Sequence, residues 1–391
     1  MPTATARKTA HSKSATKKSV HEFDPPLYRP RLKRLRTAAA AKGLSHILIT
    51  NPIDVGYLTG FLGGDSPAFI PVADAGKPTI ITDFRYVEEL AEFKPLVNVF
   101  VRKGSMGDAI NQFLSDASVT SCGVQAETMT LAERGGIAKA LGEHDSKVKA
   151  VSEIVAELRA IKDEHEIGLI TKAIAIQEKS LLAVLPTIKA GLTELDVGAA
   201  LEAEMKRRGS VQPAFVSIIA AQANGSLPHY RPGTVKLARN QPLLIDWGAQ
   251  WKGYHGDMTR TFTLGKWPPK IREIYQIVLD AHLLAAAALA PGKTTAEIDG
   301  VARAHITKHG YGEFFGHGLG HGLGMNVHEN PRVSHMAAAT PLRVGHVVTN
   351  EPGIYLPGVG GVRIEDDFVI VKGGSRNLCS LPKTMEWSTL S

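Results

Sequence analysis

The stretch GLTELDVGAALEAEMKRRG at residues 191–209 recurs without a gap as GKTTAEIDGVARAHITKHG at residues 292–310. The third residue of both copies is a threonine that is followed three residues later by an acid, which is typical of a capping box at a helix start. Both copies end on a glycine suited to a helix C-terminus. A capped amphipathic helix can recur by chance. The repeat is therefore evidence for two related half-domains only together with the segment downstream of each copy.

Each copy is followed, at a similar distance, by a β-type segment that carries two acids. Asp246 stands 55 residues after the first glycine of its copy, and Glu351 stands 59 residues after the first glycine of the other. The second acids, Asp257 and Glu365, follow at 66 and 73 residues. This pattern predicts two α/β half-domains related by a pseudo-twofold axis, each of which supplies a pair of carboxylates to the seam between them.

The acids adjoin apolar strands. Asp246 follows the run LLI at residues 243–245, and Glu365 lies in the run 362–371, so we expect both carboxylates to be buried. The ten residues between Asp246 and Asp257 include Gly248 and Gly253, which suits two facing strands of a hairpin. An acid on a hairpin is usually exposed, but a buried carboxylate requires a cation or strong hydrogen-bond donors.

The segment HGLGHGLGMNVHENP at residues 317–331 lies between the two pairs of acids and carries three histidines. Glycines at residues 316, 318, 320 and 322 argue against a regular helix and favour a loop or strand that approaches a substrate closely. A lone histidine is most often structural, whereas three among glycines favour a functional site. Four acids and an imidazole are what two hard or borderline divalent cations would require.

Length and composition limit the class of protein. A chain of 391 residues exceeds what one hydrophobic core usually serves, so we expect two domains. With 43% hydrophobic and 21% charged residues, it is typical of a soluble globular protein. The sequence has neither a long apolar run nor a secretory signal, so we expect a cytoplasmic protein that does not insert into membranes. Cys122 and Cys379 lack metal-type spacing, so a metal would be held by oxygen and nitrogen.

The formal charge of +7 does not indicate nucleic-acid binding, because residues 1–23 carry five lysines or arginines against Glu22. Residues 1–27 are rich in serine, threonine and alanine, and we expect a disordered basic tail there. Organelle targeting by this tail stays an alternative.

Strand-type and helix-type patterns alternate up to about residue 150, which predicts a small α/β domain. The expected strands are at 46–50, 78–82 and 97–101, and the expected helices are around 32–41, 86–92 and 109–113. A long helical segment with a break follows from about residue 152 to residue 188. It contains the charged sequence LRAIKDEHE at 158–166, which we interpret as the hinge between domains.

Together, these residues resemble the metallopeptidases with the pita-bread fold, specifically Xaa-Pro aminopeptidases and prolidases. The resemblance rests on the acid and histidine motifs, on LRAIK at 158–162, and on NPIDVGYLTGF at 51–61 and TDFRY at 82–86, and it covers the chain from about residue 30. It implies an α/β (α+β) chain, with a creatinase-like N-terminal domain at residues 28–153 and a pita-bread catalytic domain at residues 154–391.

The resemblance implies two divalent metal ions per subunit, with manganese as the first expectation and cobalt or zinc as alternatives. Asp246 would chelate one ion, and Asp257 and Glu365 would bridge both. His321 and Glu351 would complete the shell of the second ion.

The resemblance also assigns substrate-side roles. Glu351 would shuttle the proton to the leaving amine, while His229 and His328 would donate to the carbonyl oxygen or the tetrahedral intermediate. His317 would line or support the same pocket.

Three further residues match substrate-binding positions of the family. Phe215 would form an aromatic wall for the proline ring, Arg332 would bind the free carboxylate of a dipeptide, and Arg363 would orient a ligand. Relatives often carry a glycine in the segment matching IIAAQAN at 218–224, so the shape of the N-terminal substrate subsite is open.

The leading hypothesis is therefore an Xaa-Pro dipeptidase that acts on proline-containing peptides, and the first alternative is an Xaa-Pro aminopeptidase that acts on longer peptides. The fold also hosts a metal-independent amidine hydrolase and binding proteins, which usually lack some ligands, and a lyase that retains them. From the resemblance we expect a homodimer, with neither nucleic acid nor a membrane as partner.

Overall fold

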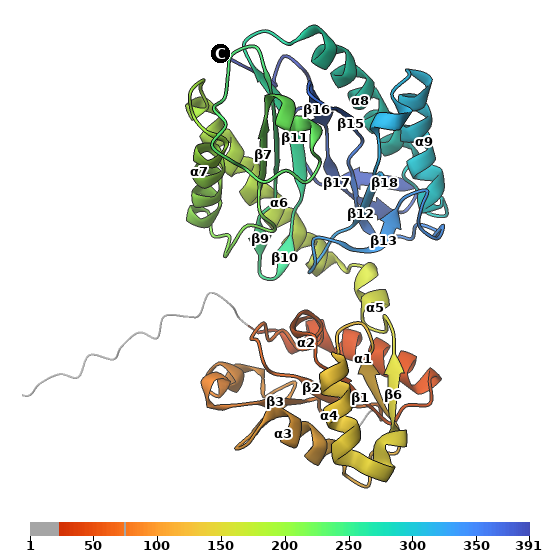
Figure 1. Ribbon diagram of the computed structural model, residues 1–391. Helices are drawn as coiled ribbons and strands as arrows, with labels where there is room; N and C mark the ends of the chain where they lie inside the picture. The colour runs from red at the N-terminus through yellow and green to blue at the C-terminus, as the bar shows by residue number, and fades with distance from the viewer. Residues whose placement is uncertain (1–22, 74–75) are drawn as a thin grey trace, which may run out of the picture.

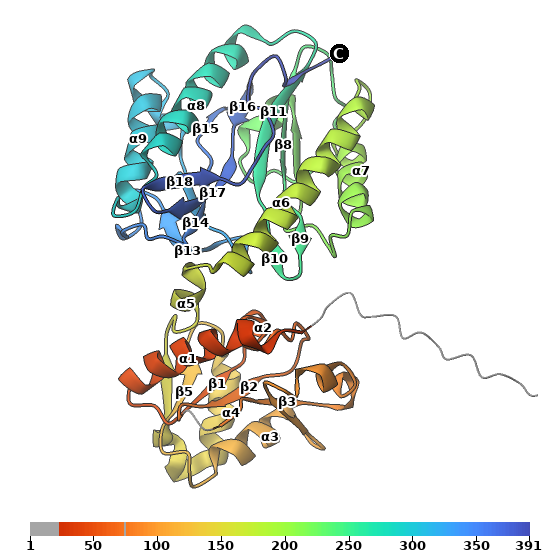
Figure 2. The same ribbon diagram turned by 180° about the vertical axis from the view of Figure 1, so that it is seen from behind.

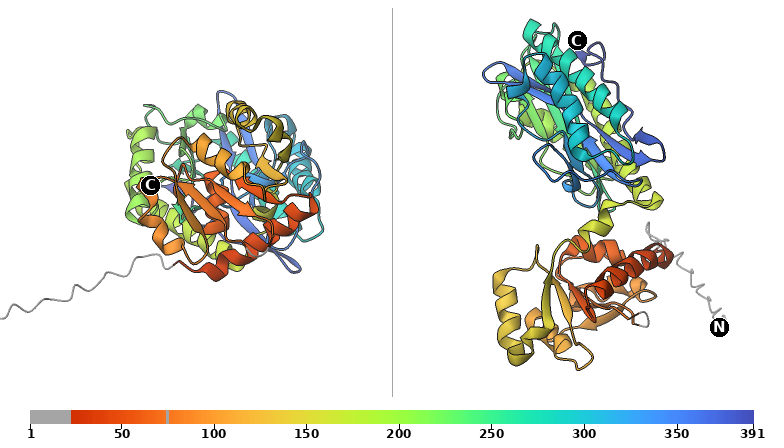
Figure 3. Two further views of the ribbon diagram at one scale, coloured as in Figure 1. Left: turned by 90° about the horizontal axis from the view of Figure 1, so that it is seen from below. Right: turned by 90° about the vertical axis from the view of Figure 1, so that its right-hand side faces the viewer.

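The computed structural model describes residues 23–73 and 76–391. An N-terminal and a C-terminal domain lie on either side of a short helix, α5 (Ala156–Ala160), as Figures 1 and 3 show. The expected tail at residues 1–27 lies outside the described residues as far as residue 22. Residues 25–27, the last residues of the expected tail, are helical and not disordered, because helix α1 (Pro25–Ala41) begins at Pro25. Prolines at its first two positions fit this start, since the first turn of a helix does not use its N–H groups.

The N-terminal domain is built around a mixed sheet of strand order β4-β3-β2-β1-β5-β6. Its strands are β1 (His46–Ile49), β2 (Ala68–Pro71), β3 (Thr79–Thr82), β4 (Asn98–Val101), β5 (Cys122–Gln125) and β6 (Val148–Val151). Its helices are α1, α2 (Pro52–Thr59), α3 (Met106–Leu114) and α4 (Leu131–Leu141). Alternate side chains of β1 face opposite ways: Ile47 packs in the core beneath α1, and Leu48 packs in the core beneath α3 and α4. The expected small α/β domain is confirmed.

One element of this domain differs from the expected secondary structure. Residues 86–92 form no regular α-helix; the chain makes the 3-10 turns η1 (Phe84–Tyr86) and η2 (Glu89–Phe93) instead. The Asp83 side chain accepts a hydrogen bond from the N–H of Arg85, which favours a tight turn over a helical start. Pro95 follows soon after and leaves too little chain for an α-helix.

The long helical segment is broken where the two domains meet. Helix α6 (Glu164–Val184) begins at a capping box between Asp163 and Glu166, so the preceding residues belong to α5 and a short connection. In that connection the N–H of Lys162 donates to the carbonyl of Gly345 at 2.8 Å. This hydrogen bond attaches the connection between the two domains to the C-terminal domain.

The C-terminal domain has two halves, each with a sheet covered by helices on its outer side (Figures 1 and 2). The first half contains α6, α7 (Glu194–Arg207) and a sheet of order β19-β11-β8-β7, and the second contains α8 (Pro269–Ala288), α9 (Thr295–Lys308) and a sheet of order β13-β12-β14-β17-β18. The strands of the first half are β7 (Ile218–Ala221), β8 (Pro242–Trp247), β9 (Gln250–Trp251), β10 (Tyr254–His255) and β11 (Met258–Leu264), joined by β19 (Thr389–Leu390). Those of the second are β12 (Gly320–Gly322), β13 (Glu329–Val333), β14 (Val347–Asn350), β15 (Gly353–Leu356), β16 (Gly360–Arg363), β17 (Asp366–Val371) and β18 (Gly374–Asn377).

The sequence repeat corresponds to helices α7 and α9. Each begins with a capping box, Thr193 with Asp196 in α7 and Thr294 with Glu297 in α9. Each is followed by a glycine with positive φ, +101° at Gly209 and +84° at Gly310. The prediction of two related half-domains is confirmed at these helices.

Three large hydrophobic cores lie in these domains. One is continuous from the N-terminal domain into the first half of the C-terminal domain, so that Leu35, Ile170 and Ile245 belong to a single cluster. A second lies within the second half and includes Ile274 and Ile354, and a third lies beneath α3 and α4. Among the described residues, no helix has the length and apolar character needed to cross a membrane.

The two repeat glycines provide a matched pair of substitutions. Gly310→Ala adds a methyl group with nothing within 4 Å, so it should cost only the left-handed backbone strain of about 1–2 kcal/mol. Gly209→Ala incurs the same strain and also places the methyl group 2.9 Å from Cζ3 of Trp251. We expect urea unfolding to show a larger loss of unfolding free energy for Gly209→Ala. Equal losses would contradict the packing of Trp251 against the end of α7.

Candidate metal centre and substrate cavity

The first pair of acids lies where two antiparallel strands meet. Asp246 is in β8 and pairs with Thr259 of β11, while Asp257 immediately precedes β11. Both carboxylates are buried. The short β9–β10 hairpin joins the two strands, so the expected facing arrangement is confirmed.

The second pair of acids comes from the other half of the domain. Glu351 follows β14, and Glu365 lies between β16 and β17. Thr259 connects the two halves: its hydroxyl donates to Glu365 Oε2 at 2.6 Å, and its carbonyl accepts from the N–H of Glu365 at 3.1 Å. Because Thr259 also pairs with Asp246, one residue fixes acids from both halves.

His321 lies in the short strand β12, beside these acids. Its Nε2 is 3.3 Å from Glu351 Oε1 and 3.7 Å from Asp257 Oδ2. A Cβ atom at the neighbouring Gly320 would collide with the backbone of Thr349, so glycine is required for the close approach of β12 and β14. Of the predicted glycine-rich loop or strand, residues 320–322 form a strand.

The five candidate ligands line one cavity of about 610 Å³. Three of them, Asp257, His321 and Glu365, offer ligand atoms that all lie within 4.8 Å of one another. A larger hollow of about 890 Å³ lies over α1 at the seam between the domains, but its lining includes none of the candidate site residues. The chemistry is therefore concentrated in the smaller cavity.

The electrostatics of this cavity favour a bound cation. Burial, and then the charges of Glu365 and Asp246, raise the pKa of Asp257 well above its ordinary value. Burial, and then Glu351 and Asp246, raise the pKa of Glu365 in the same way. For Glu351, burial opposes ionisation, but hydrogen bonding and charge interaction with His321 outweigh it and lower the pKa. The negative charges of these acids repel one another, and a bound cation would reduce this repulsion.

Asp246 has one carboxylate oxygen that is free to bind a metal. Its Oδ2 accepts from Arg363 Nη2 at 2.5 Å, and its buried Oδ1 has no hydrogen-bond partner among the described residues. A buried carboxylate oxygen without a partner is costly, and a metal ion would satisfy it. Oxygen donors with one imidazole suit manganese, cobalt or zinc, so the residues fit the expected cofactor.

Arg363 contacts the candidate ligand Asp246 directly. Besides Asp246, its guanidinium donates to the hydroxyls of Thr259 at 2.9 Å and Tyr355 at 3.0 Å. Tyr355 also hydrogen-bonds to Nε2 of His317 at 2.8 Å. Tyr355 was missed by sequence reasoning, because only the folded hairpin β15–β16 brings it to this group.

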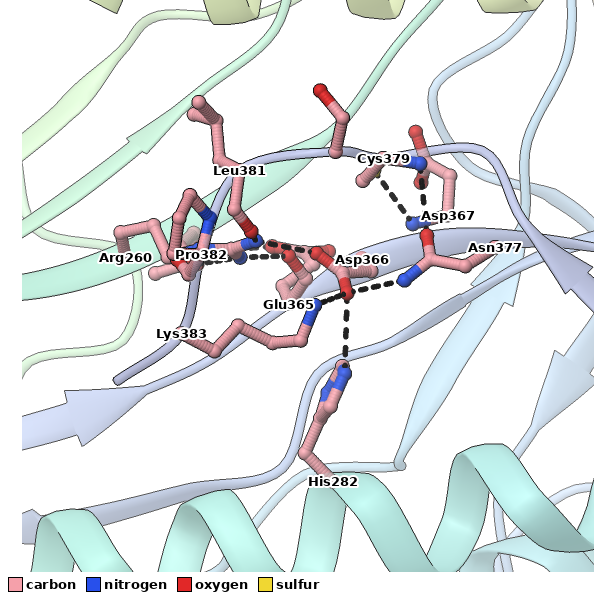
Figure 4. A network of polar contacts seen from close by, with 12 residues as sticks. Arg260, His282, Glu365, Asp366, Asp367, Asn377, Cys379, Leu381, Pro382 and Lys383 are labelled. Carbon is pink, nitrogen blue, oxygen red and sulfur yellow. Dashed lines mark hydrogen bonds and ion pairs between the residues drawn. The ribbon is translucent and has the colours of Figure 1, made fainter. Parts of the chain in front are cut away.

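A second buried arginine, Arg260, holds the backbone of the Glu365 segment. Its Nη1 donates to the carbonyl of Glu365 and its Nη2 to Asp366 Oδ1, both at 2.6 Å. Figure 4 shows that His282, Lys383 and Asn377 also point toward Asp366. Three consecutive acids followed by the apolar run FVIV at residues 368–371 were a sequence signal that such partners exist, since buried charges require compensation.

The candidate substrate residues line the same cavity as the acids. They are Phe215, His229, His317, His328 and Arg332, together with Arg363. The ring of His328 stands edge-on to that of His321, with centroids 4.2 Å apart. Burial, and then the charge of His321, lower the pKa of His328 to about 4, so it is neutral near pH 7. Arg332 lies in β13 with an exposed side chain.

The segment that carries His229 is held by a buried acid that sequence reasoning also missed. Glu194, at the start of α7, accepts from the hydroxyl of Tyr230 at 2.8 Å and from the N–H of Gly233 at 2.9 Å. Its other oxygen accepts from Asn224 and from the N–H of Ala221. The segment at 218–224 is therefore tied to α7.

Comparisons with known proteins agree with this geometry. Residues 31–161 match the creatinase/prolidase N-terminal domain, and residues 168–372 match metallopeptidase family M24. An uncharacterized peptidase, YqhT, of Bacillus subtilis (strain 168) is 36% identical over 355 residues, which cover 91% of this chain and 99% of that protein.

Two solved structures have the same architecture. An Xaa-Pro dipeptidase from Bacillus anthracis superimposes with a TM-score of 0.86 at 33% identity, covering 91% of this chain and 98% of its own. An X-Pro aminopeptidase from Thermotoga maritima MSB8 gives a TM-score of 0.80 at 33% identity, covering 89% of this chain and 99% of its own. With both domains matched in order and more than half of the chain spanned by the catalytic match, the chain belongs to metallopeptidase family M24 and carries a creatinase/prolidase N-terminal domain.

Proposed function

We propose that this metallopeptidase hydrolyses the peptide bond before proline and acts as an Xaa-Pro dipeptidase. The observation that carries the proposal is the cavity in which four acids and His321 adjoin three further histidines and an exposed arginine. The similarity to an Xaa-Pro dipeptidase over 91% of this chain supports the substrate class. An X-Pro aminopeptidase is equally identical, so aminopeptidase action on longer peptides is the second candidate.

We assign the metal ligands to Asp246, Asp257, His321, Glu351 and Glu365. The unpartnered Oδ1 of Asp246 and the raised pKa values of Asp257 and Glu365 support the assignment. Bound divalent cations would supply Lewis-acid polarisation of the scissile carbonyl and a lowered pKa for the attacking water.

The chain's own residues handle protons and charge at the scissile bond. Glu351, 3.3 Å from His321, is placed to accept a proton at its carboxylate and pass it to the leaving amine. His328 is neutral near pH 7 because of its low pKa, so it can donate its ring N–H to the carbonyl oxygen without adding charge beside the cations. His229 lines the same cavity and would donate from another side, while His317 supports Arg363 through Tyr355.

Phe215 and Arg332 would set the substrate. Phe215 would pack against the proline ring, and Arg332 would bind a free carboxylate, which a dipeptide presents directly after proline. The exposed position of Arg332 in the cavity lining supports this role.

We further propose manganese as the metal, a homodimer as the assembly and the cytoplasm as the location. Manganese is the first choice from the family resemblance, and the mixed oxygen and nitrogen donors agree equally with cobalt or zinc. The homodimer rests on the family resemblance, and the location is supported by the free cysteines Cys122 and Cys379, which suit a reducing compartment.

Removal of metal should abolish hydrolysis of Ala-Pro, and addition of manganese, cobalt or zinc should restore it. Asp257→Asn should lower metal content and reduce the rate by more than about 100-fold, the upper range for loss of a residue that merely supports a metal site. Metal analysis and steady-state kinetics on the same preparations test this. Asp145→Asn, which alters an acid paired with Arg134 in the N-terminal domain, is the control and should retain activity. Full activity in a metal-free Asp257→Asn protein would refute the mechanism.

The role of Arg332 predicts a specific interaction with the carboxylate of the substrate. The wild type should hydrolyse Ala-Pro at least about 10-fold faster than Ala-Pro-amide, as expected for loss of about 1.5 kcal/mol or more from a charge-assisted pair. Arg332→Met should remove most of this difference by slowing Ala-Pro alone. Equal rates on the two substrates in the wild type would instead favour the aminopeptidase.

A further inference from the structure

The residue after His328 is a buried carboxylate that two cations hold. Glu329 Oε2 lies 2.5 Å from Arg159 Nη2, and Glu329 Oε1 lies 2.6 Å from Lys162 Nζ. Both cations come from the LRAIK motif between the domains, which the proposed chemistry does not otherwise use. The side chains are 5%, 1% and 7% exposed for Arg159, Lys162 and Glu329, so the pairs are shielded from water.

The same ion pairs extend into the N-terminal domain. Arg159 Nη1 lies 2.8 Å from Asp54 Oδ1 in α2. The other oxygen of Asp54 accepts from Gln125 Nε2 at 2.5 Å, and Gln125 Oε1 accepts from the N–H of Asn51 at the start of α2. Charges alternate in the order Asp54, Arg159, Glu329 and Lys162, and we call these four residues the interdomain ion chain. Alternation lets each buried charge be neutralised by a neighbour.

The backbone around Glu329 is shaped to fit this chain. A Cβ atom at Gly324 would collide with Glu329 Oε1 and would lie 3.0 Å from Cε of Lys162, so glycine leaves room for the ion pair. The N–H of Asn326 donates to Glu329 Oε2 at 3.3 Å, and the N–H of Lys162 donates to Gly345. Glu329 is therefore fixed to the link on one side and to its own loop on the other.

Anchoring Glu329 also fixes the residues that face the substrate. Glu329 points toward Arg159 and Lys162, whereas its chain neighbour His328 lines the substrate cavity. Arg332 and Ser334, farther along the same segment, line the cavity as well. A small movement of Glu329 would move these substrate-facing side chains.

We propose that Arg159 and Lys162 are positioning residues, which hold His328 in its productive place through Glu329, with Asp54 extending the anchor into the N-terminal domain. This proposal rests on the assignment of His328 in the proposed function. It gives the N-terminal domain a direct part in shaping the substrate cavity.

The main alternative is a purely structural role, and the charge pattern allows a test. Replacing a buried ion pair by apolar groups of similar volume is often neutral for stability. Removing one partner alone is destabilising, because it leaves a buried charge without a partner. The double variant Lys162→Met/Glu329→Leu removes one cation and one anion, and it leaves Asp54 paired with Arg159. It should retain its fold and metal content yet lose the anchor of His328.

We expect Lys162→Met/Glu329→Leu to lower kcat on Ala-Pro by about 10- to 100-fold, the scale of a misplaced catalytic group. In a His328→Ala background, the same pair of substitutions should lower kcat by less than about 2-fold, because residues that act through one another are not additive. Losses that multiply in full across the two backgrounds, or an unchanged kcat, would overturn the proposal. If the leucine variant does not fold, Lys162→Met/Glu329→Gln is judged by the same two criteria.

Hydrogen exchange on the full chain provides a test that needs no substrate. Amides in residues 324–333 should exchange faster in the double variant than in the wild type. Glu166→Gln is the matched control, since Glu166 is a buried acid at the same seam whose partners are Arg31, Tyr254 and the N–H of Asp163, and glutamine can keep the capping box. It should leave kcat and exchange in residues 324–333 unchanged, and wild-type protection in the double variant would overturn the anchor. If the wild type cleaved no Xaa-Pro peptide, the proposed function would fail, while the exchange result would still decide whether the ion chain anchors this segment.

Discussion

The structure depends on one electrostatic constraint, which is that carboxylates from two halves of a domain meet in a cavity that removes them from water. Each acid loses hydration there and repels the others, so the group cannot remain fully ionised unaided. Arg363 offsets one acid and His321 offsets another. The remaining uncompensated negative charge is that of Asp257 and Glu365, whose pKa values are raised well above the ordinary range. A divalent cation matches both the missing charge and the ligand chemistry, so the fold and its cofactor are complementary.

The cavity is held by a recurring device, in which the residue next to a candidate site residue is the anchor. Asp366 follows Glu365 and binds Arg260, Glu329 follows His328 and binds Arg159, and Tyr230 follows His229 and binds Glu194. In each case the neighbour is tied into the protein by a polar contact, while the candidate site residue lines the cavity. Precision at the site therefore depends on buried polar contacts behind it.

Local patterns predicted what depends on local physics. The capping boxes and terminal glycines of α7 and α9 were predictable because their hydrogen bonds span only a few residues. The acids could be identified from their place beside apolar strands, since burial of a charge needs an explanation. Contacts between distant segments could not be inferred in the same way: Tyr355 reaches Arg363 through a hairpin, and Glu329 meets cations more than 160 residues earlier. The 3-10 turns near Phe84 reflect a short segment in which one side-chain contact outweighs helical periodicity.

The continuous core that joins the two domains determines which parts of the protein should unfold together. Residues as distant as Leu35 and Ile245 share one apolar cluster, whereas most of the second half of the C-terminal domain has its own. Cooperative units follow such packing rather than the order of domains along the chain, so the N-terminal domain and the first half should open as one unit. The candidate ligands are divided between this unit and the second half. A bound metal would then hold together two parts of the protein that unfold separately. Loss of the metal would allow one part to unfold before the other.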